Sequence, residues 1–147
     1  MIEQKEWGSF NEAVVYLFTI INARGNKVQL TNYGASMVAV MVPDKDGKCE
    51  NVVLGFPSLE GYLQDKCYIG TTIGRFANRI AKGSFNIDGR QYFLELNENN
   101  NSNHSGERGF NTQVFDSEIN KDSVVFSLLS SDGAGGFPGN LKVEVAY

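Results

Sequence analysis

The chain has 147 residues, with 13 Lys and Arg against 17 Asp and Glu and a formal net charge of -4. This length fits one domain, residues 1–147, that can bury a core without disulfides. Hydrophobic residues make up 41% of the chain and aromatic residues 12%, which is typical of a folded protein. Because no dense basic run tracks a phosphate backbone, the composition argues against nucleic acid as a partner.

Residues 1–7 are polar, and no apolar segment has the length of a signal peptide or of a bilayer span. We therefore expect a cytoplasmic protein with no membrane partner. The two cysteines, Cys49 and Cys67, do not have the spacing of a zinc site and are expected to be reduced, structural thiols.

Strand patterns begin with Ala13–Ile21, which is rich in β-branched and aromatic residues. Turn residues 22–26 and the extended pattern Lys27–Leu30 follow, so a hairpin is predicted. Another strand is expected from Gly34 to Val42, where Pro43 and a polar cluster end it. Residues Pro57–Leu63 could form a helix, but the glycine within this segment limits it to a turn or two.

Further strands are predicted in the second half of the chain. The dipeptide Asp88-Gly89 separates two alternating segments, and such a turn strongly favours a hairpin. Segments 113–119, 123–129 and 141–147 show similar patterns. Many short strands between turns predict an all-β fold, an antiparallel β-sandwich. The last strand runs to the end of the chain with no covering segment, which predicts an open sheet edge.

The segment Gly74–Ile80 is the richest in side chains that could bind a ligand, because it contains Arg75, Asn78 and Arg79. The only histidine of the chain, His104, follows about two dozen residues later. Guanidinium, amide and imidazole groups can hold the hydroxyls of a neutral sugar. The alternative is that the arginines pair with surface carboxylates and that His104 is a loop residue.

The sequence lacks the motifs of several other kinds of active site. There is no G-x-S-x-G elbow, no two-histidine metal helix and no G-x-G-x-x-G after a strand. The glycine-rich segment 133–139 lacks the lysine of a phosphate loop and is expected to be a flexible connection. The asparagine-rich patch between residues 97 and 103 is expected to be a polar surface loop.

The segment Gly74–Phe85, GRFANRIAKGSF, resembles the G-R-x-A-N-R-I-x-x-G-x-F signature of the aldose 1-epimerase family. The stretch Asn101–Gly106, NSNHSG, is similar to the N-x-L-H-G-G segment of that family, and further matches span nearly the whole chain. The resemblance implies part of a β-supersandwich that binds an aldohexose such as galactose or glucose. It also implies interconversion of the α and β anomers by acid–base ring opening, without a metal or organic cofactor.

Carried over by position, Asn78 and Arg79 resemble the sugar-binding pair of the family. His104 resembles the first histidine of the family, which hydrogen-bonds the sugar. His104 is therefore the expected catalytic residue of this chain. Arg75 is the second choice among the sugar-binding residues.

Three positions depart from the family pattern; two of them, Asn103 and Ser105, touch the site, and Ser105 matters more. Ser105 stands where a glycine is usual, so its side chain could shift the loop that aims the histidine. Asn103 replaces a leucine, and Phe115 replaces a tryptophan.

The general-acid histidine and general-base glutamate of the family fall in segments that would follow Tyr147. The chain alone, as an N-terminal portion of the domain, is therefore expected to be inactive or weakly active. Its open edge is expected to favour self-association or pairing with a complementing C-terminal half.

Two alternatives to the enzyme remain. The chain could be a non-catalytic carbohydrate-binding or interaction module that kept Asn78, Arg79 and His104. It could also be a relative that acts on phosphorylated sugars, although the GRFANRI stretch is more similar to the free-sugar branch.

Overall fold

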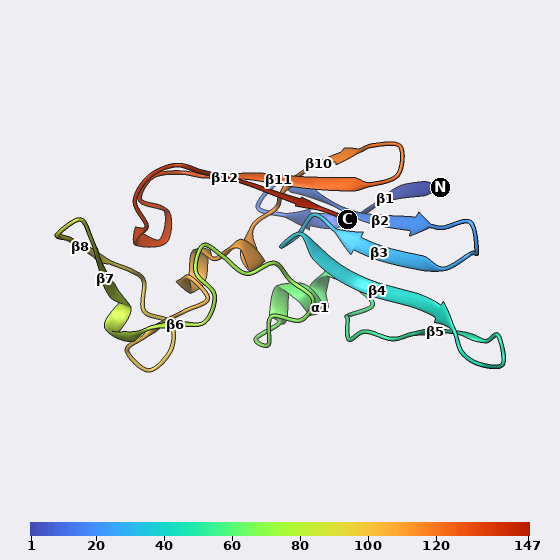
Figure 1. Cartoon of the computed structure of the whole chain (residues 1–147), viewed down its shortest axis with the longest axis horizontal. Coiled ribbons are helices and arrows are strands. Elements are labelled where there is room, and N and C mark those ends of the chain that lie inside the picture. Colours follow the sequence, from blue (N-terminus) through green and yellow to red (C-terminus); the bar gives the residue numbers. More distant parts are fainter.

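The computed structural model describes residues 1–147, and most of its regular structure is antiparallel β-sheet. The largest sheet has five strands that follow one another in chain order, each antiparallel to its neighbour (Figure 1). These strands are β1 (Ile2–Phe10), β2 (Ala13–Ile21), β3 (Lys27–Thr31), β4 (Ser36–Pro43) and β5 (Cys49–Asn51).

A three-stranded antiparallel sheet packs on the first one and forms the second layer of a sandwich (Figure 1). The two layers meet where Phe18 of β2 contacts Phe126 of β11, with ring centroids 5.4 Å apart. Both rings are fully buried, so this contact belongs to the main apolar core. The predicted antiparallel sandwich is thereby confirmed, and its second layer consists of β10 (Asp116–Ile119), β11 (Val124–Ser130) and β12 (Leu141–Ala146).

The single α-helix, α1 (Leu59–Gln64), covers a second apolar cluster beside the large sheet. Leu59 and Tyr62 are its buried residues, and the Tyr62 ring lies 5.7 Å from that of Trp7. Gly61 faces the ring of Phe56 so closely that a Cβ atom there would lie 2.5 Å from the Phe56 Cβ. The glycine that limits the length of the helix therefore allows an aromatic side chain to pack against it.

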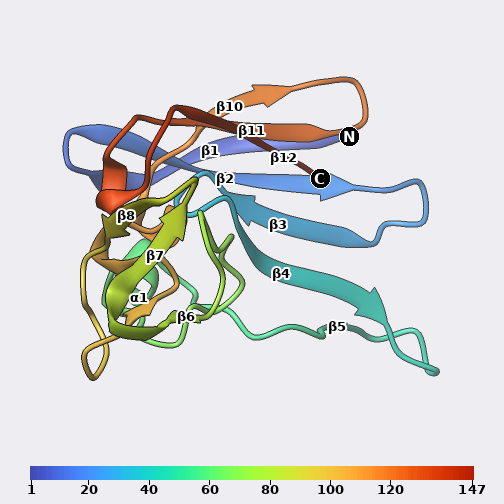
Figure 2. The ribbon, with the colours of Figure 1, turned by 60° about the vertical axis from the view of Figure 1, so that its left-hand side comes forward.

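Two small two-stranded antiparallel pairs, β6 with β9 and β7 with β8, form the other end of the molecule, where Figure 2 labels β6, β7 and β8. As predicted, Asp88 and Gly89 both have positive φ, at 50° and 78°, and make the tight turn between β7 and β8. The elements of this end are β6 (Arg79–Ile80), β7 (Ser84–Ile87), β8 (Arg90–Phe93) and β9 (Ser102–Asn103). Short 3-10 turns lie at Ala81–Gly83, Gly106–Arg108, Phe110–Thr112 and Ala134–Gly136.

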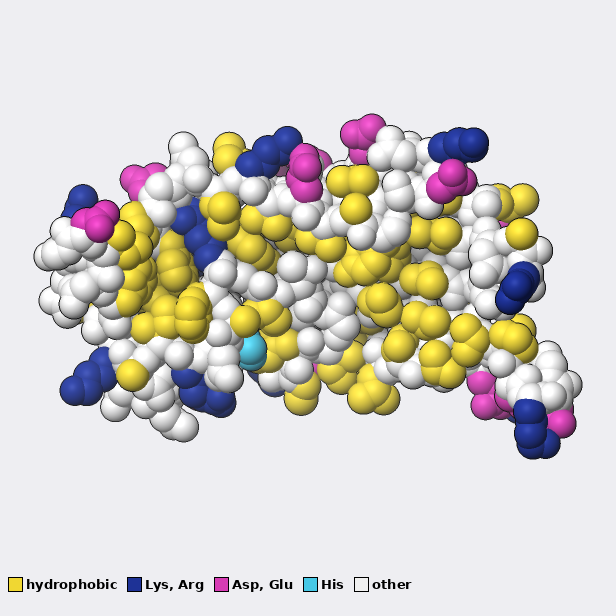
Figure 3. Space-filling model, in the orientation of Figure 1, with side chains coloured by type: hydrophobic (Ala, Val, Ile, Leu, Met, Phe, Trp, Pro, Cys, Tyr) yellow, Lys and Arg dark blue, Asp and Glu magenta, His cyan; other side chains and the backbone are white.

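Strand β12 pairs with β11 only, so β12 is an edge strand of the three-stranded sheet. Apolar side chains also gather over the face of the large sheet that Figure 3 shows, and Leu54, just past β5, is 78% exposed. Whether another chain covers these surfaces stays a prediction. No helix has the length and apolar character needed to cross a membrane.

Candidate functional site

The short pairing of β6 with β9 brings the ANR segment next to the only histidine. Arg79 lies opposite Asn103 in this ladder, so Asn78 and His104 meet just beyond it. Both residues have left-handed backbone conformations, with φ of 69° and 53°. Asparagine and histidine tolerate this region better than most residues.

Asn78 and His104 form two hydrogen bonds with each other. The N–H of His104 donates to the carbonyl oxygen of Asn78 at 3.1 Å, and the N–H of Asn78 donates to Nδ1 of His104 at 3.0 Å. Because Nδ1 accepts, the neutral imidazole carries its proton on Nε2. The histidine therefore offers an N–H donor on the side of the ring away from Asn78.

Arg79 is held by two neighbours at the surface. Its Nε and Nη2 donate to the two carboxylate oxygens of Glu98, the second at 2.7 Å, and its Nη1 donates to Oδ1 of Asn78 at 3.0 Å. The Asn78 amide thus uses its oxygen on Arg79 and leaves its Nδ2 for a ligand. The hydrogen bond from Arg79 lowers the pKa of Glu98, and the same pair raises the pKa of Arg79.

The ring of Tyr68 packs against the imidazole of His104. The two ring centroids lie 4.5 Å apart, with 59° between the ring planes. Tyr68 has a φ of 58°, and its turn is fixed by Asp65, whose carboxylate accepts from the N–H of Cys67 at 2.8 Å and of Ile69 at 2.7 Å. Burial, followed by the charges of Glu107 and Glu98, raises the pKa of Tyr68, which keeps its hydroxyl protonated.

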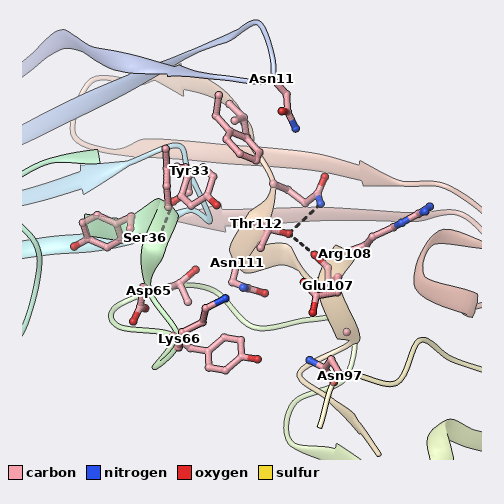
Figure 4. A pocket seen from close by; sticks show the side chains of 18 of the residues that line it. Asn11, Tyr33, Ser36, Asp65, Lys66, Asn97, Glu107, Arg108, Asn111 and Thr112 are labelled. Atoms are coloured by element: carbon pink, nitrogen blue, oxygen red, sulfur yellow. Dashed lines mark hydrogen bonds between the residues drawn. The ribbon is translucent and has the colours of Figure 1, made fainter. Parts of the chain in front are cut away.

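A polar cleft of about 750 Å³ adjoins this group, between α1, the β1–β2 turn and residues 107–114 (Figure 4). Asn78, Arg79 and His104 are not part of its wall, but Tyr68 and Glu98 are. The expected sugar-binding side chains therefore sit beside the cleft, in contact with two of its lining residues. Other side chains that face the cleft include Asp65, Lys66, Asn97, Glu107 and Asn111.

Ser105 adopts the left-handed conformation that a glycine would favour, with φ of 73°. Its hydroxyl accepts from the N–H of Phe76 at 2.8 Å and donates to the Phe76 carbonyl at 3.2 Å. The serine side chain does not point away from the site but connects the His104 loop to the segment that precedes Asn78.

Arg75 does not join this group, and its guanidinium faces a different part of the chain. All five guanidinium N–H donors are used on the segment 130–139 of the chain. Nε donates to Oγ of Ser130 at 2.9 Å, and the terminal nitrogens donate to the carbonyls of Ser130, Ser131, Pro138 and Gly139. Burial lowers the pKa of Arg75, against the charge of Asp132. Its role in this structure is to hold the glycine-rich segment.

Two members of the group, Tyr68 and Glu98, were not singled out from the sequence. Glu98 lies in the asparagine-rich patch, which was expected to be only a polar loop. Nothing in the spacing marks Tyr68 either, since it follows an unremarkable polar turn. No three His, Cys, Asp or Glu side chains gather in a way that could hold a metal ion, and both cysteines are free and exposed.

Comparison with known proteins identifies relatives over most of the chain. The family model described as aldose 1-epimerase matches residues 16–147. A galactose mutarotase of Homo sapiens is 46% identical over 121 residues, 82% of this chain and 35% of that protein. An aldose 1-epimerase of Escherichia coli (strain K12) is 36% identical over 132 residues, 89% of this chain and 38% of that protein.

Solved structures show the same relationship. A galactose 1-epimerase from Lactobacillus acidophilus NCFM has a TM-score of 0.87 at 28% identity, over 100% of this chain and 44% of that one. A GalM/aldose epimerase homologue from C. elegans has a TM-score of 0.83 at 33% identity, over 88% and 40% of the two chains. The chain thus spans little more than a third of the length of the curated relatives that it matches. Its sequence and its fold place the chain in the aldose 1-epimerase family.

Proposed function

We propose that this chain binds an aldohexose such as galactose or glucose, as the sugar-holding part of an enzyme that interconverts the α and β anomers. The observation that carries the proposal is the pair of hydrogen bonds between Asn78 and His104, with Arg79 alongside. It brings the adjacent Asn78 and Arg79 and the distant His104, which is 26 positions after Asn78, into one surface group.

The donors of this group suit a neutral polyol. His104 offers Nε2–H, Asn78 offers its Nδ2 amide, and Arg79 keeps N–H groups on both terminal nitrogens. Sugar hydroxyls can accept from these planar donors, and they can donate to the carboxylate of Glu98. The ring of Tyr68, beside the imidazole, adds an apolar surface for the C–H face of a hexose.

Anomer exchange also needs a base for the anomeric hydroxyl and an acid for the ring oxygen. The chain has one histidine, whose Nδ1 is already engaged. The nearby carboxylate, Glu98, is held by Arg79 and has a lowered pKa, which makes it a weak base. We therefore propose that this group binds and orients the sugar, while the acid and base come from other segments of the family domain.

Sugar binding is tested by titrating the chain with D-galactose and D-glucose and following amide shifts by NMR. Arg79→Ala and His104→Ala should each weaken binding about tenfold, as expected for the loss of hydrogen bonds to a ligand. Arg24→Ala is the matched control, because Arg24 is an exposed arginine in the β2–β3 turn. Equal affinity in all three variants would contradict the proposed site.

Catalysis is tested separately by polarimetry on freshly dissolved α-D-glucose and α-D-galactose. We expect the chain alone to add little to the spontaneous rate, because no acid–base pair is assembled in it. Rapid mutarotation by the chain would contradict our placement of the acid and base, while leaving the sugar site untouched.

A non-catalytic carbohydrate-binding module is the second candidate. The observation in its favour is that the only carboxylate paired with a residue of this group, Glu98, is already occupied by an arginine. Hexose binding without catalysis, at concentrations where the chain self-associates as well as in dilute solution, would support the module over the enzyme part.

A further inference from the structure

The asparagine-rich patch, residues 97–103, contains a turn that is closed by backbone hydrogen bonds. The N–H groups of Asn97 and Glu98 donate to the carbonyl of Asn101, and the N–H of Asn101 donates back to Glu98 at 2.8 Å. Between them, Asn99 and Asn100 have φ of 45° and 64°, the conformation of a tight hairpin turn that asparagine tolerates.

This turn is tied to the strand that leads to the histidine. The side chain of Asn97 accepts from the N–H of Asn103 at 2.7 Å and donates to the Asn103 carbonyl at 3.0 Å. On the other side, Oδ1 of Asn101 accepts from the N–H of Lys82, just past β6, at 3.2 Å. Glu98 is therefore carried on a turn that is anchored to both strands of the β6–β9 pair, and its carboxylate faces Arg79.

The ion pair decides which part of the guanidinium is left for a ligand. A guanidinium has five N–H donors, and Glu98 takes Nε–H and one hydrogen of Nη2, while Asn78 takes one hydrogen of Nη1. One hydrogen remains on each terminal nitrogen. Such a pair of neighbouring N–H groups can bind two oxygens at once, for example the adjacent hydroxyls of a hexose.

We propose that Glu98 is a positioning residue for sugar binding, which holds one side of Arg79 so that the two remaining N–H groups are fixed toward neighbouring hydroxyls of an aldohexose. This inference rests on the proposed function, because it requires that Arg79 contacts the sugar. The asparagine turn at residues 97–101 is the support that aims the carboxylate.

The physical reason lies in the length and exposure of the arginine side chain. The side chain of Arg79 is 52% exposed, so without a partner it would sample many rotamers and lose that freedom on binding. The pair with Glu98 orders the Arg79 side chain before a ligand binds, because a bidentate pair fixes both the position and the plane of the guanidinium. The lowered pKa of Glu98 keeps the pair charged at neutral pH.

A competing role of the carboxylate defines the test. If the carboxylate competed with sugar oxygens for Arg79, removing it would tighten binding. The two roles therefore predict changes of affinity in opposite directions.

The experiment compares the full chain with Glu98→Gln, which keeps the shape but not the two acceptor oxygens, and with Glu98→Asp, which keeps the charge on a shorter side chain. Glu144→Gln is the control, because Glu144 forms an exposed pair with Lys142 at 2.8 Å on β12. Each protein is titrated with D-galactose and D-glucose, and the Nε–H signal of Arg79 is followed by NMR.

We expect Glu98→Gln to raise the dissociation constant about two- to tenfold, in line with the cost of ordering one long side chain. Its Arg79 Nε–H should exchange faster with water, Glu98→Asp should restore part of the affinity, and the control should match the wild type. Unchanged or tighter binding by Glu98→Gln, in a wild type that binds hexose, overturns this inference alone. A wild-type chain that binds no hexose overturns the proposed function, and this inference with it.

Discussion

The backbone N–H of Asn78 donates to Nδ1 of His104 at 3.0 Å, so a backbone group of the ANR segment sets the tautomer of the imidazole. The second bond between the two residues, from the N–H of His104 to the Asn78 carbonyl, keeps the ring in register with that segment. The imidazole faces a ligand with a donor at Nε2 rather than an acceptor.

Two substitutions of His104 should separate its two nitrogens. His104→Asn places an amide oxygen near the position of Nδ1, so it can keep the bond from Asn78 but not the donor at Nε2. His104→Gln can reach the Nε2 position instead. We expect the asparagine variant to keep an ordered loop and to bind hexose about tenfold more weakly, and the glutamine variant to retain more of the affinity.

Long-range proton–nitrogen NMR spectra measure the tautomer directly, and the single imidazole makes them unambiguous to assign. In its neutral form, the imidazole of the free protein should carry its proton on Nε2 and none on Nδ1. A spectrum with the proton on Nδ1 would contradict the hydrogen bond from Asn78.

Ser105 should matter for stability because of its bond to Phe76. Ser105→Ala keeps the left-handed conformation but leaves the N–H of Phe76 without its acceptor at 2.8 Å, so the free energy of unfolding should fall by about 1–3 kcal/mol. Ser105→Gly loses the same bond but relieves the positive φ of 73°, which costs a non-glycine residue about 1 kcal/mol or more. Urea unfolding should therefore rank the glycine variant between the wild type and the alanine variant.

Arg75 should behave as a structural residue. Arg75→Lys keeps the charge, but an ammonium cannot reach the four carbonyls and the hydroxyl that the guanidinium bonds. We expect the free energy of unfolding to fall by about 2–4 kcal/mol, with faster hydrogen exchange in residues 131–139.

The same substitution should leave hexose affinity within about twofold of the wild type, whereas Arg79→Lys should weaken it further, because only Arg79 belongs to the proposed site. A larger loss of affinity in Arg75→Lys, with the segment 131–139 still ordered, would show instead that Arg75 takes part in sugar binding.

The hairpins could be predicted from the sequence where the strand pattern and the turn residues both indicate one. The hairpin of β2 and β3 was predicted because its apolar strands bury one face against the core, and that of β7 and β8 because an Asp-Gly turn demands positive φ. Strand β1 was missed: most of its side chains are exposed, and its order comes from the hydrogen-bond ladder with β2. The exposed three-residue strand β5 was missed for the same reason.

The site was only partly predictable for a related reason. Asn78, Arg79 and His104 stand in a motif. Four of the five groups that accept from Arg75 are backbone carbonyls, which leave no mark in a sequence. Glu98 was hidden because its turn is built from asparagines, which are typical of any polar loop. Only the β6–β9 ladder shows that this loop returns beside Arg79.

Asn32, at the junction of the two layers, should also contribute to stability. It is 3% exposed, its Oδ1 accepts from the N–H of Tyr16 at 2.8 Å, and its Nδ2 donates to the carbonyl of Phe115 at 3.3 Å. Asn32→Ala should lower the free energy of unfolding by about 2–4 kcal/mol, because buried backbone groups lose their partners. Asn32→Asp should be worse, since a carboxylate would face that carbonyl. Thermal unfolding of both variants gives the ranking.

Acid should weaken sugar binding through Glu98. Because Arg79 lowers the pKa of this carboxyl below its usual value of 4.5, the ion pair is intact at neutral pH and is lost only as the pH falls through the lowered pKa in the fold. Protonation removes the charge that holds the guanidinium, so hexose affinity should decline as the pH falls through the lowered pKa of Glu98.

Glu98→Gln separates this effect from general acid unfolding. The variant has no carboxyl to protonate, so its already weaker affinity should not fall further until the chain itself unfolds. Titrations with D-galactose at a series of pH values, each with a circular dichroism spectrum, measure both. If the wild type and Glu98→Gln lose affinity in parallel as the pH falls, the acid effect arises from another group and not from the carboxylate beside Arg79.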